Sequence, residues 1–391
     1  MLRKARLHQL PQFARAFHAP ALQLAVPEEE DMDGAATQPL IRGGDDDSKA
    51  PVRWQPIVKS SLFGSDTFDN PFPEWKAVGG LPGPSATAKA VPMMLMNSEK
   101  RLPPPGELDR LVPVVAPQFG EFLAKDKLRV HWMGHASVLV QLEGATILTD
   151  PIFSSRCSPV QWAGGAKRFR PPPCEVRDLP PLDAVLISHN HFDHLDSNSV
   201  RDLLARDPDL KFFVPLGLGA WLRGAGAREV HELGWWEERE LAAASGARVK
   251  ITGVPAMHWS NRGLDKCQSL WCGFALEGLG FGKKFYFAGD TGYTVAFKDV
   301  GAILGPFDAA AIPIGAYDPE WFLKVQHTNP EEGVQMHVDV GSKASFGIHW
   351  GTFQLSMEPV GEPAERWLKE GRRRGIGEEV FTLAIGGSRT I

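Results

Sequence analysis

The alternation of hydrophobic and polar positions along the chain predicts many short buried strands and a few amphipathic helices. Strands are predicted where a short apolar run is bounded by glycine, proline or polar residues, and helices where apolar residues recur every three or four positions. The predicted strands are 128–132, 137–142, 145–148, 184–187, 212–214, 248–254, 270–276, 284–287, 309–312, 344–348 and 381–385. The predicted helices are 197–207, one that starts at Asn329, and 362–373. Strands that first cluster and then alternate with helices predict an α/β fold in which two mixed sheets lie between helical layers.

The segment 1–69 follows a different pattern and is predicted to be a low-complexity extension to a single large domain at 70–391. Its start, 1–27, has basic but no acidic residues, and an acidic run follows. This pattern fits an organelle transit peptide, an amphipathic segment that binds a membrane surface, or a frayed terminus. The stretch 70–75 and the prolines at 103–105 are predicted to be irregular chain, and the compact core to start near Leu128.

Size and charge narrow the class of protein. A chain of 391 residues with 43% hydrophobic residues can bury a large core. The formal net charge of −5 provides no general basic field, which argues against nucleic-acid binding. The four cysteines form no CxxC pair, which is typical of reduced thiols in an intracellular protein. No apolar run approaches the roughly 18 residues that span a bilayer, so we expect any membrane contact to be peripheral.

The stretch 182–196 is the most informative part of the sequence, because a buried strand ends there in a turn rich in metal-type ligands. Burying so many imidazoles and carboxylates without a cation or hydrogen bonds would be costly. The order His-x-His-x-Asp-His suits two metal ions, with His189 and His191 on one and Asp193 and His194 on the other. Ligands of this type without thiolates favour zinc, with iron or manganese as alternatives. The alternative to a metal site is a solvated, histidine-rich loop.

Further residues of metal-ligating type follow later strands in the same way. His258 lies beyond the strand at 248–254, Asp290 beyond 284–287 and His349 beyond 344–348. Strand ends gather at one edge of a sheet, so these side chains can converge with the motif at 189–194. Taken singly, each of the two histidines would also fit a hydrogen-bonded core residue.

In this order, the candidate ligands resemble the metal-binding pattern of the metallo-β-lactamase superfamily. The resemblance implies an αβ/βα four-layer sandwich and two Zn²⁺ per chain. It assigns His189, His191 and His258 to one ion, Asp193, His194 and His349 to the other, and Asp290 to a bridging position.

Longer stretches are similar to the N-acylphosphatidylethanolamine-hydrolysing phospholipase D family. They are 132–136, 149–156, 287–293, 313–317, 326–327 and 348–352, and the likeness runs from about Asn70 to the C-terminus. The resemblance implies hydrolysis of N-acylphosphatidylethanolamine to an N-acylethanolamine and phosphatidic acid, by attack of a metal-bridging hydroxide on phosphorus. It also implies a peripheral membrane enzyme that acts on a phospholipid and forms a homodimer.

The resemblance suggests further roles at the site. Catalysis is assigned to Asp193 and Asp290, and to His327 as a residue that orients the phosphate or amide of the substrate. A capping or core role just before the helix at Asn329 is the alternative for His327. Tyr317, Trp259 and Trp321 are candidate substrate contacts, with ordinary packing as the alternative.

Neighbouring polar residues are candidates for holding the ligand imidazoles in place. Asp150 and Asp196 can accept hydrogen bonds from the outer ring nitrogens, and Asp196 can instead cap the helix at 197–207. His135 can act in the same way or simply pack in its turn.

Two other functions share the same sequence features. Another hydrolase of the superfamily, such as a sugar-phosphate lactonase or a thioesterase, would keep the metal ligands and differ in its substrate pocket. A non-enzymatic scaffold with a structural zinc site would not need two ions with open coordination, which argues against that reading.

Overall fold

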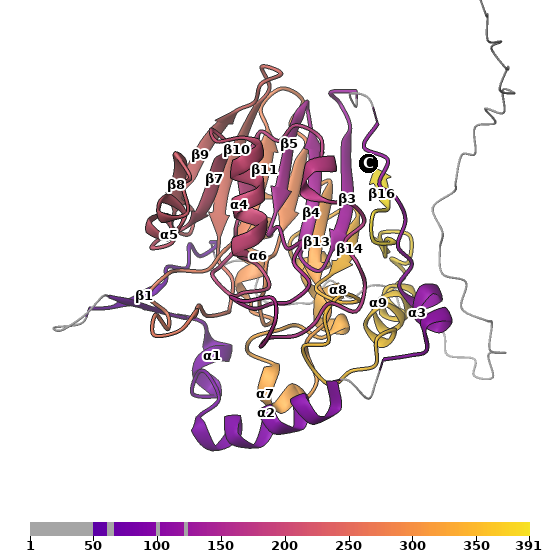
Figure 1. The fold of residues 1–391 in the computed structure, drawn as a ribbon. Coiled ribbons are helices and arrows are strands. Elements are labelled where there is room, and N and C mark those ends of the chain that lie inside the picture. Colours follow the sequence, from indigo (N-terminus) through magenta and orange to yellow (C-terminus); the bar gives the residue numbers. More distant parts are fainter. Residues whose placement is uncertain (1–49, 61–65, 99–101, 121–123) are drawn as a thin grey trace, which may run out of the picture.

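The computed structural model describes residues 50–60, 66–98, 102–120 and 124–391. Two seven-stranded sheets face each other, and helices cover their outer faces (Figure 1). This arrangement confirms the predicted α/β fold of two mixed sheets between helical layers. None of the helices in the described part of the chain is both long and apolar enough to cross a membrane.

The first sheet is mixed, and its parallel half carries the loop with the His-x-His-x-Asp-His motif at 189–194. Its strand order is β16 (Ser388–Thr390), β3 (Leu128–Gly134), β4 (Ser137–Leu142), β5 (Ala145–Thr149), β6 (Ala184–Leu186), β7 (Lys211–Pro215) and β8 (Glu229–Leu233). Neighbours from β16 to β5 are antiparallel, and neighbours from β5 to β8 are parallel.

The second sheet repeats this division. Its order is β15 (Val380–Phe381), β14 (Ser345–Ile348), β13 (Ala309–Pro313), β12 (Lys284–Phe287), β11 (Gly273–Gly278), β10 (Arg248–Val254) and β9 (Glu238–Ala242). Strands β9 to β12 are antiparallel, and β12 to β15 are parallel. A separate antiparallel hairpin joins β1 (Ile57–Lys59) to β2 (Thr67–Asp69).

Both faces of the first sheet are buried. Alternate residues of a strand point to opposite sides, and each side packs in a separate apolar cluster. In β4, Val138 and Val140 belong to the large core between the sheets, whereas Leu139 packs under the outer helices. The outer cluster includes Val200 and Leu203 of α4 (Ser197–Arg206). Continuous apolar strands are therefore expected here, and the sequence has them.

Helices α4 and α8 (Pro330–Asp339) begin at residues whose side chains cap them. Asp196 accepts hydrogen bonds from the amides of Asn198 and Ser199 at the start of α4, as predicted. Asn329 and Glu332 form a capping box at the start of α8. The remaining helices are α1 (Pro73–Ala77), α2 (Pro84–Ser98), α3 (Pro105–Leu111), the 3₁₀ helix η2 (Val176–Asp178), α5 (Gly219–Gly224), α6 (Ala296–Leu304), α7 (Glu320–Leu323) and α9 (Glu362–Arg373).

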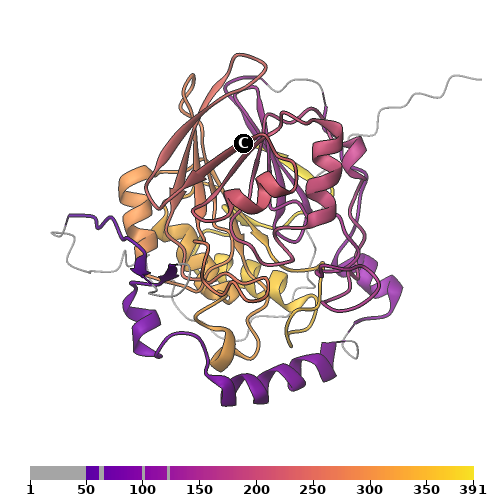
Figure 2. The ribbon, with the colours of Figure 1, turned by 60° about the vertical axis from the view of Figure 1, so that its left-hand side comes forward.

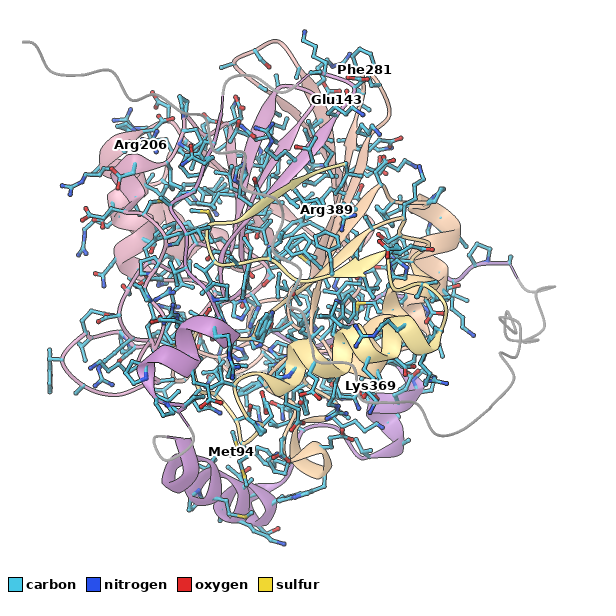
Figure 3. All side chains as sticks on the ribbon, turned by 90° about the vertical axis from the view of Figure 1, so that its right-hand side faces the viewer. Met94, Glu143, Arg206, Phe281, Lys369 and Arg389 are labelled. Atoms are coloured by element: carbon cyan, nitrogen blue, oxygen red, sulfur yellow. The ribbon has the colours of Figure 1, made fainter. Side chains whose placement is uncertain are left out.

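The structure corrects the prediction of irregular chain before residue 128. The stretch 70–75 leads into helix α1 with Trp75 buried, and α3 starts at Pro105. Helix α2 runs along the lower edge of the molecule (Figure 2). Its residue Met94 lies at the end of the molecule opposite to Glu143 (Figure 3).

The packed structure also reaches back before the predicted boundary at residue 70. The Trp54 indole nitrogen donates to Asp299 Oδ2 at 2.7 Å, and the Trp236 indole nitrogen donates to the Trp54 carbonyl at 2.8 Å. The predicted transit or membrane-surface segment at 1–27 lies outside the described residues.

Glu143 joins the two sheets at the end marked by its label in Figure 3. It sits in the β4–β5 turn, and only 4% of its surface is exposed. Its carboxylate accepts hydrogen bonds from the amides of Gly280, Phe281 and Lys283 in the β11–β12 turn, at 2.8 to 3.0 Å. A charged acceptor therefore satisfies three backbone donors of the opposite sheet.

We expect Glu143→Gln to lower the free energy of unfolding by about 1–3 kcal/mol, because an amide cannot accept all of these hydrogen bonds and leaves buried donors unsatisfied. Urea denaturation followed by circular dichroism measures this change. Glu240→Gln is the control, because its ion pair with Arg248 lies on the surface. Equal stability of Glu143→Gln and the native protein would contradict the proposed link between the sheets.

Candidate metal centre

The candidate ligands gather where several strands end. The His189–His194 loop follows β6, and His258, Asp290 and His349 follow β10, β12 and β14. Strands β10, β12 and β14 run in the same direction, so their carboxyl ends meet at one edge of the second sheet. The first sheet brings the end of β6 to the same place, which joins residues far apart in sequence.

A first group consists of His189, His191 and His258. His191 Nδ1 lies 2.8 Å from His189 Nε2 and 3.2 Å from His258 Nε2. The outer nitrogen of His258 lies 2.9 Å from the Gln326 carbonyl, which can only accept a hydrogen bond. His258 Nδ1 is therefore the donor, and its Nε2 directs a lone pair into the group.

The same reasoning fixes His189. Its Nδ1 lies 2.9 Å from Ser188 Oγ, and that hydroxyl donates to Asp150 Oδ2 at 2.6 Å. Because the hydroxyl proton is already used, Ser188 accepts from His189, and His189 Nε2 also carries a lone pair. Lone pairs that face one another repel unless a cation lies between them, so this group fits a metal ion.

A second group consists of Asp193, His194, His349 and His135. Asp193 Oδ2 lies 2.9 Å from His135 Nε2, 3.3 Å from His194 Nε2 and 3.5 Å from His349 Nε2. The outer nitrogen of His194 lies 2.7 Å from Asp150 Oδ2, so the predicted hydrogen bond of Asp150 to a candidate ligand is confirmed.

Asp290 lies between the two groups. Its Oδ2 is 3.0 Å from His349 Nε2, 3.1 Å from His194 Nε2, 3.9 Å from His258 Nε2 and 4.0 Å from His189 Nε2. One buried carboxylate thus faces imidazoles of both sets, which is the position that a bridging ligand would take.

The electrostatics of the cluster favour positive charge between the carboxylates. Burial lowers the pKa of His349, but Asp290 and Asp193 outweigh this effect and raise it to about 9. Burial likewise opposes protonation of His194, yet the same two carboxylates raise its pKa well above the usual value. The first group has the opposite behaviour, because burial lowers the pKa of His191 to about 4 and leaves its ring neutral, as a metal ligand must be.

Unsatisfied polar atoms support the same conclusion. Buried atoms without a hydrogen-bond partner include Asp290 Oδ1 and His327 Nδ1, and His327 Nδ1 lies 3.8 Å from Asp290 Oδ2. Such atoms are rare in folded proteins, and their concentration here calls for a ligand or solvent. The nitrogen and oxygen donors without thiolates fit zinc, and also iron or manganese.

The backbone around the cluster is held in unusual conformations. His135, Asp150 and His349 have φ values of 53°, 33° and 63°, in the left-handed region that residues with a Cβ rarely adopt. Gly289 has a φ of 63°, and a Cβ there would lie 2.8 Å from Ser188 Cβ. Only glycine allows the strand end that carries Asp290 to approach this closely.

The structure brings some of the remaining predicted residues into the cluster. The His327 ring stacks on His349 with 5.1 Å between centroids, and its Nδ1 lies 3.8 Å from Asp290 Oδ2. The Trp259 ring contacts His191 edge-on at 4.7 Å and donates to the Gln326 side chain.

Other predicted residues have different partners. The Tyr317 hydroxyl donates to Glu362 at 2.7 Å, and Trp321 is 54% exposed beside Phe322. The prediction that Asp196 holds an imidazole is wrong, because its carboxylate is used by the cap of α4 and by Ser154.

Sequence reasoning missed two residues that support the cluster. The Asn70 amide donates to the His258 carbonyl at 2.8 Å, and Arg262 contacts the loop that carries His189 and His191. A polar residue before Pro71 and a lone arginine in a loop give no local signal of such long-range contacts.

Comparisons with known proteins agree with this geometry. A family model described as a Beta-lactamase superfamily domain matches residues 145–350. The N-acyl-phosphatidylethanolamine-hydrolyzing phospholipase D 1 of Caenorhabditis elegans is 43% identical over 314 residues, which cover 78% of this chain and 85% of that protein. The chain belongs to the N-acylphosphatidylethanolamine-hydrolysing phospholipase D family.

A second relative and a solved structure extend this picture. The mitochondrial N-acyl-phosphatidylethanolamine-hydrolyzing phospholipase D of Saccharomyces cerevisiae is 37% identical over 65% of this chain and 54% of that protein. The metallo hydrolase Igni18 of the archaeon Ignicoccus hospitalis shares the fold, with a TM-score of 0.52 and 19% identity over 68% of this chain and 98% of its own. As a member of the phospholipase D family, the chain is a hydrolase of the β-lactamase superfamily with a candidate His/Asp metal centre.

The hydrogen bonds of Asp150 to the candidate metal centre can be tested by mutation. Asp150→Asn should reduce metal affinity by about 10–100-fold, because Asn has one accepting oxygen in place of two. It cannot satisfy the Ser188 amide at Oδ1 together with the Ser188 hydroxyl and His194 at Oδ2, so the imidazole loses its orientation. Metal retained after dialysis against graded chelator, measured by inductively coupled plasma mass spectrometry, reports the affinity. Asp209→Asn, an exposed carboxylate paired with Arg228, is the control. Native-like retention by Asp150→Asn would contradict the assigned role.

Proposed function

We propose that the chain is a zinc-dependent phospholipase D that hydrolyses N-acylphosphatidylethanolamine to an N-acylethanolamine and phosphatidic acid. The observation that carries the proposal is the position of Asp290 between two groups of imidazoles. The names of the relatives from Caenorhabditis elegans and Saccharomyces cerevisiae support this substrate.

The donor set provides for two cations. His189, His191 and His258 would hold one, Asp193, His194 and His349 the other, and Asp290 would contact both. Two bound divalent cations lower the pKa of water and offset negative charge on a phosphodiester, which is the chemistry that this hydrolysis needs.

The protein side chains around this pair have separate tasks. Asp150 receives hydrogen bonds from Ser188 and His194, and so keeps the inner nitrogens of both His189 and His194 free to bind. His135 keeps Asp193 in place. Fixed groups of this kind do not need to reorganise as charge develops in the transition state.

His327 is proposed to orient the substrate. Its side chain is 13% exposed and lies beside Asp290 and His349, where it would contact a bound phosphate or amide. Trp259, which packs edge-on against His191, would contact the apolar part of the substrate.

Membrane contact is proposed to be peripheral. Trp321 on α7 is half exposed, and Lys89 Nζ of α2 lies 5.2 Å from its ring. An exposed indole beside a cation suits the interface of an anionic bilayer, and α2 lies along the same edge of the molecule (Figure 2). The homodimer implied by the resemblance, and an organelle transit role for the N-terminal segment, stay predictions of the same proposal.

Product analysis tests the proposal directly. Zinc-loaded protein incubated with N-acylphosphatidylethanolamine in mixed micelles should release N-acylethanolamine and phosphatidic acid, which mass spectrometry identifies. Treatment with a chelator should stop the release, and added zinc should restore it. Absence of both products from metal-loaded protein would refute the substrate and favour a lactonase or thioesterase on the same centre.

Replacing Asp290 tests the shared carboxylate. Asp290→Asn should reduce turnover by more than about 100-fold, the upper end of the loss caused by changing groups that only support a ligand, because it removes the charge between the two imidazole groups. Initial rates in mixed micelles, with the metal content of each sample measured in parallel, give the comparison. Asp299→Asn is the matched control, because this carboxylate accepts a hydrogen bond from the Trp54 indole and lies outside the cluster. Retained turnover in Asp290→Asn would refute the bimetallic assignment.

A further inference from the structure

We infer that Arg262 is a positioning residue that fixes the spacing between His258 and the pair His189–His191. The inference deepens the proposed function, because it rests on the assignment of these three imidazoles to one cation.

The three imidazoles come from loops of different sheets. His189 and His191 follow β6 of the first sheet, whereas His258 lies between β10 and β11 of the second. The chain between the two loops is long, so local backbone geometry does not set their separation. Side-chain contacts across the sheets must set it, and a small displacement would change how the lone pairs converge.

Arg262 crosses from the second loop to the first. Its Nη1 donates to the Asn190 carbonyl at 3.0 Å and to the Leu195 carbonyl at 2.7 Å, and its Nη2 donates to Ser197 Oγ at 3.2 Å. These acceptors span both ends of the loop that holds the His-x-His-x-Asp-His motif. One guanidinium therefore ties the whole motif to the loop of His258.

Aromatic rings hold the guanidinium in this place. Arg262 Cζ lies 4.1 Å from the centroid of the Phe192 ring and 5.1 Å from that of Trp221. Ring contacts of this kind stabilise a cation and restrict its rotation. Because three of its five donors bind the motif loop and its first helical residue, Arg262 acts on the site by positioning this loop.

A reciprocal set of hydrogen bonds closes the connection. The Asn190 side chain donates to Asp265 Oδ2 at 2.9 Å and accepts from the Asn261 amide at 2.6 Å. Asp265 Oδ1 in turn accepts from the Arg262 amide at 2.6 Å. The residue between the two motif histidines is thus bound by the second loop on its side chain and on its carbonyl.

Lysine cannot replace this arrangement. The planar guanidinium presents donors in a fixed fork, whereas an ammonium is a single point charge on a flexible stem. A lysine at this position would keep the charge and much of the packing, and would bind only part of the loop at a time.

The experiment compares metal affinity in Arg262→Met, Arg262→Lys and Arg248→Met. Each purified protein is loaded with zinc and titrated with a competing chelator, and the zinc retained is measured. Arg262→Met should show a dissociation constant at least about tenfold higher for one of the two zinc ions, with Arg262→Lys between it and the native protein. Arg248 forms a surface ion pair at the other end of β10, so Arg248→Met should bind as the native protein does.

Melting temperatures separate positioning from general stability. A positioning role predicts that the rise in melting temperature on adding zinc is smaller in Arg262→Met than in the native protein. A merely structural role would lower the melting temperatures with and without zinc equally and would leave the dissociation constants unchanged, which would overturn the inference.

A second variant covers the case in which Arg262→Met does not fold. Asp265→Ala removes the half-buried carboxylate that accepts from the Asn190 side chain and the Arg262 amide. It should raise the zinc dissociation constant, as Arg262→Met does. Native-like zinc binding by Asp265→Ala would then overturn the inference. Zinc binding is measured without substrate, so absence of phospholipase activity in the native protein would refute the proposed function and still leave this comparison decisive.

Discussion

The convergence of imidazole lone pairs on the buried carboxylate of Asp290 is the constraint on which the rest of the site depends. His349 Nε2 and His194 Nε2 lie within 3.1 Å of its Oδ2, and His189 Nε2 lies 4.0 Å away. A folded chain tolerates such crowding only where positive charge can be placed in the centre. The outer hydrogen bonds of His189, His194 and His258 make this explicit, because they occupy the outer nitrogens of these three rings and leave only their inner nitrogens for a ligand.

The architecture serves this constraint through geometry. In each sheet the strands that precede the ligands run in the same direction, so their carboxyl ends bring loops distant in sequence to the same region. The cost appears in the backbone, where His135, Asp150 and His349 adopt left-handed conformations. Such strain persists only where the surrounding packing enforces it, and the fully buried strands on either side supply that packing.

The sequence predicts the parts of the site that are local and leaves out those that are long-range. The turn after β6, the cap of α4 by Asp196 and the hydrogen bond of Asp150 follow from spacing and residue type, and the sheets follow from apolar runs. Helix α2 was not predicted, because its apolar and polar residues give no clear stripe. The contact of Asn70 with His258 spans 188 positions, and no local pattern encodes it. The assignment of Asp196 to an imidazole failed because the amides of Asn198 and Ser199, at the start of α4, donate to the same carboxylate.

Division of the ligands between two sheets has a further physical consequence. A cation bound by His258 and by the His189–His191 pair can gain its full binding energy only when both sheets are correctly packed, so metal binding and inter-sheet packing stabilise each other. Glu143 secures the sheets at one end, and the loops around Arg262 secure them at the ligand end. The rigidity of the sandwich is therefore part of the chemistry, since a hydrolytic centre built from separate loops is only as well defined as the contacts that hold those loops at a fixed distance.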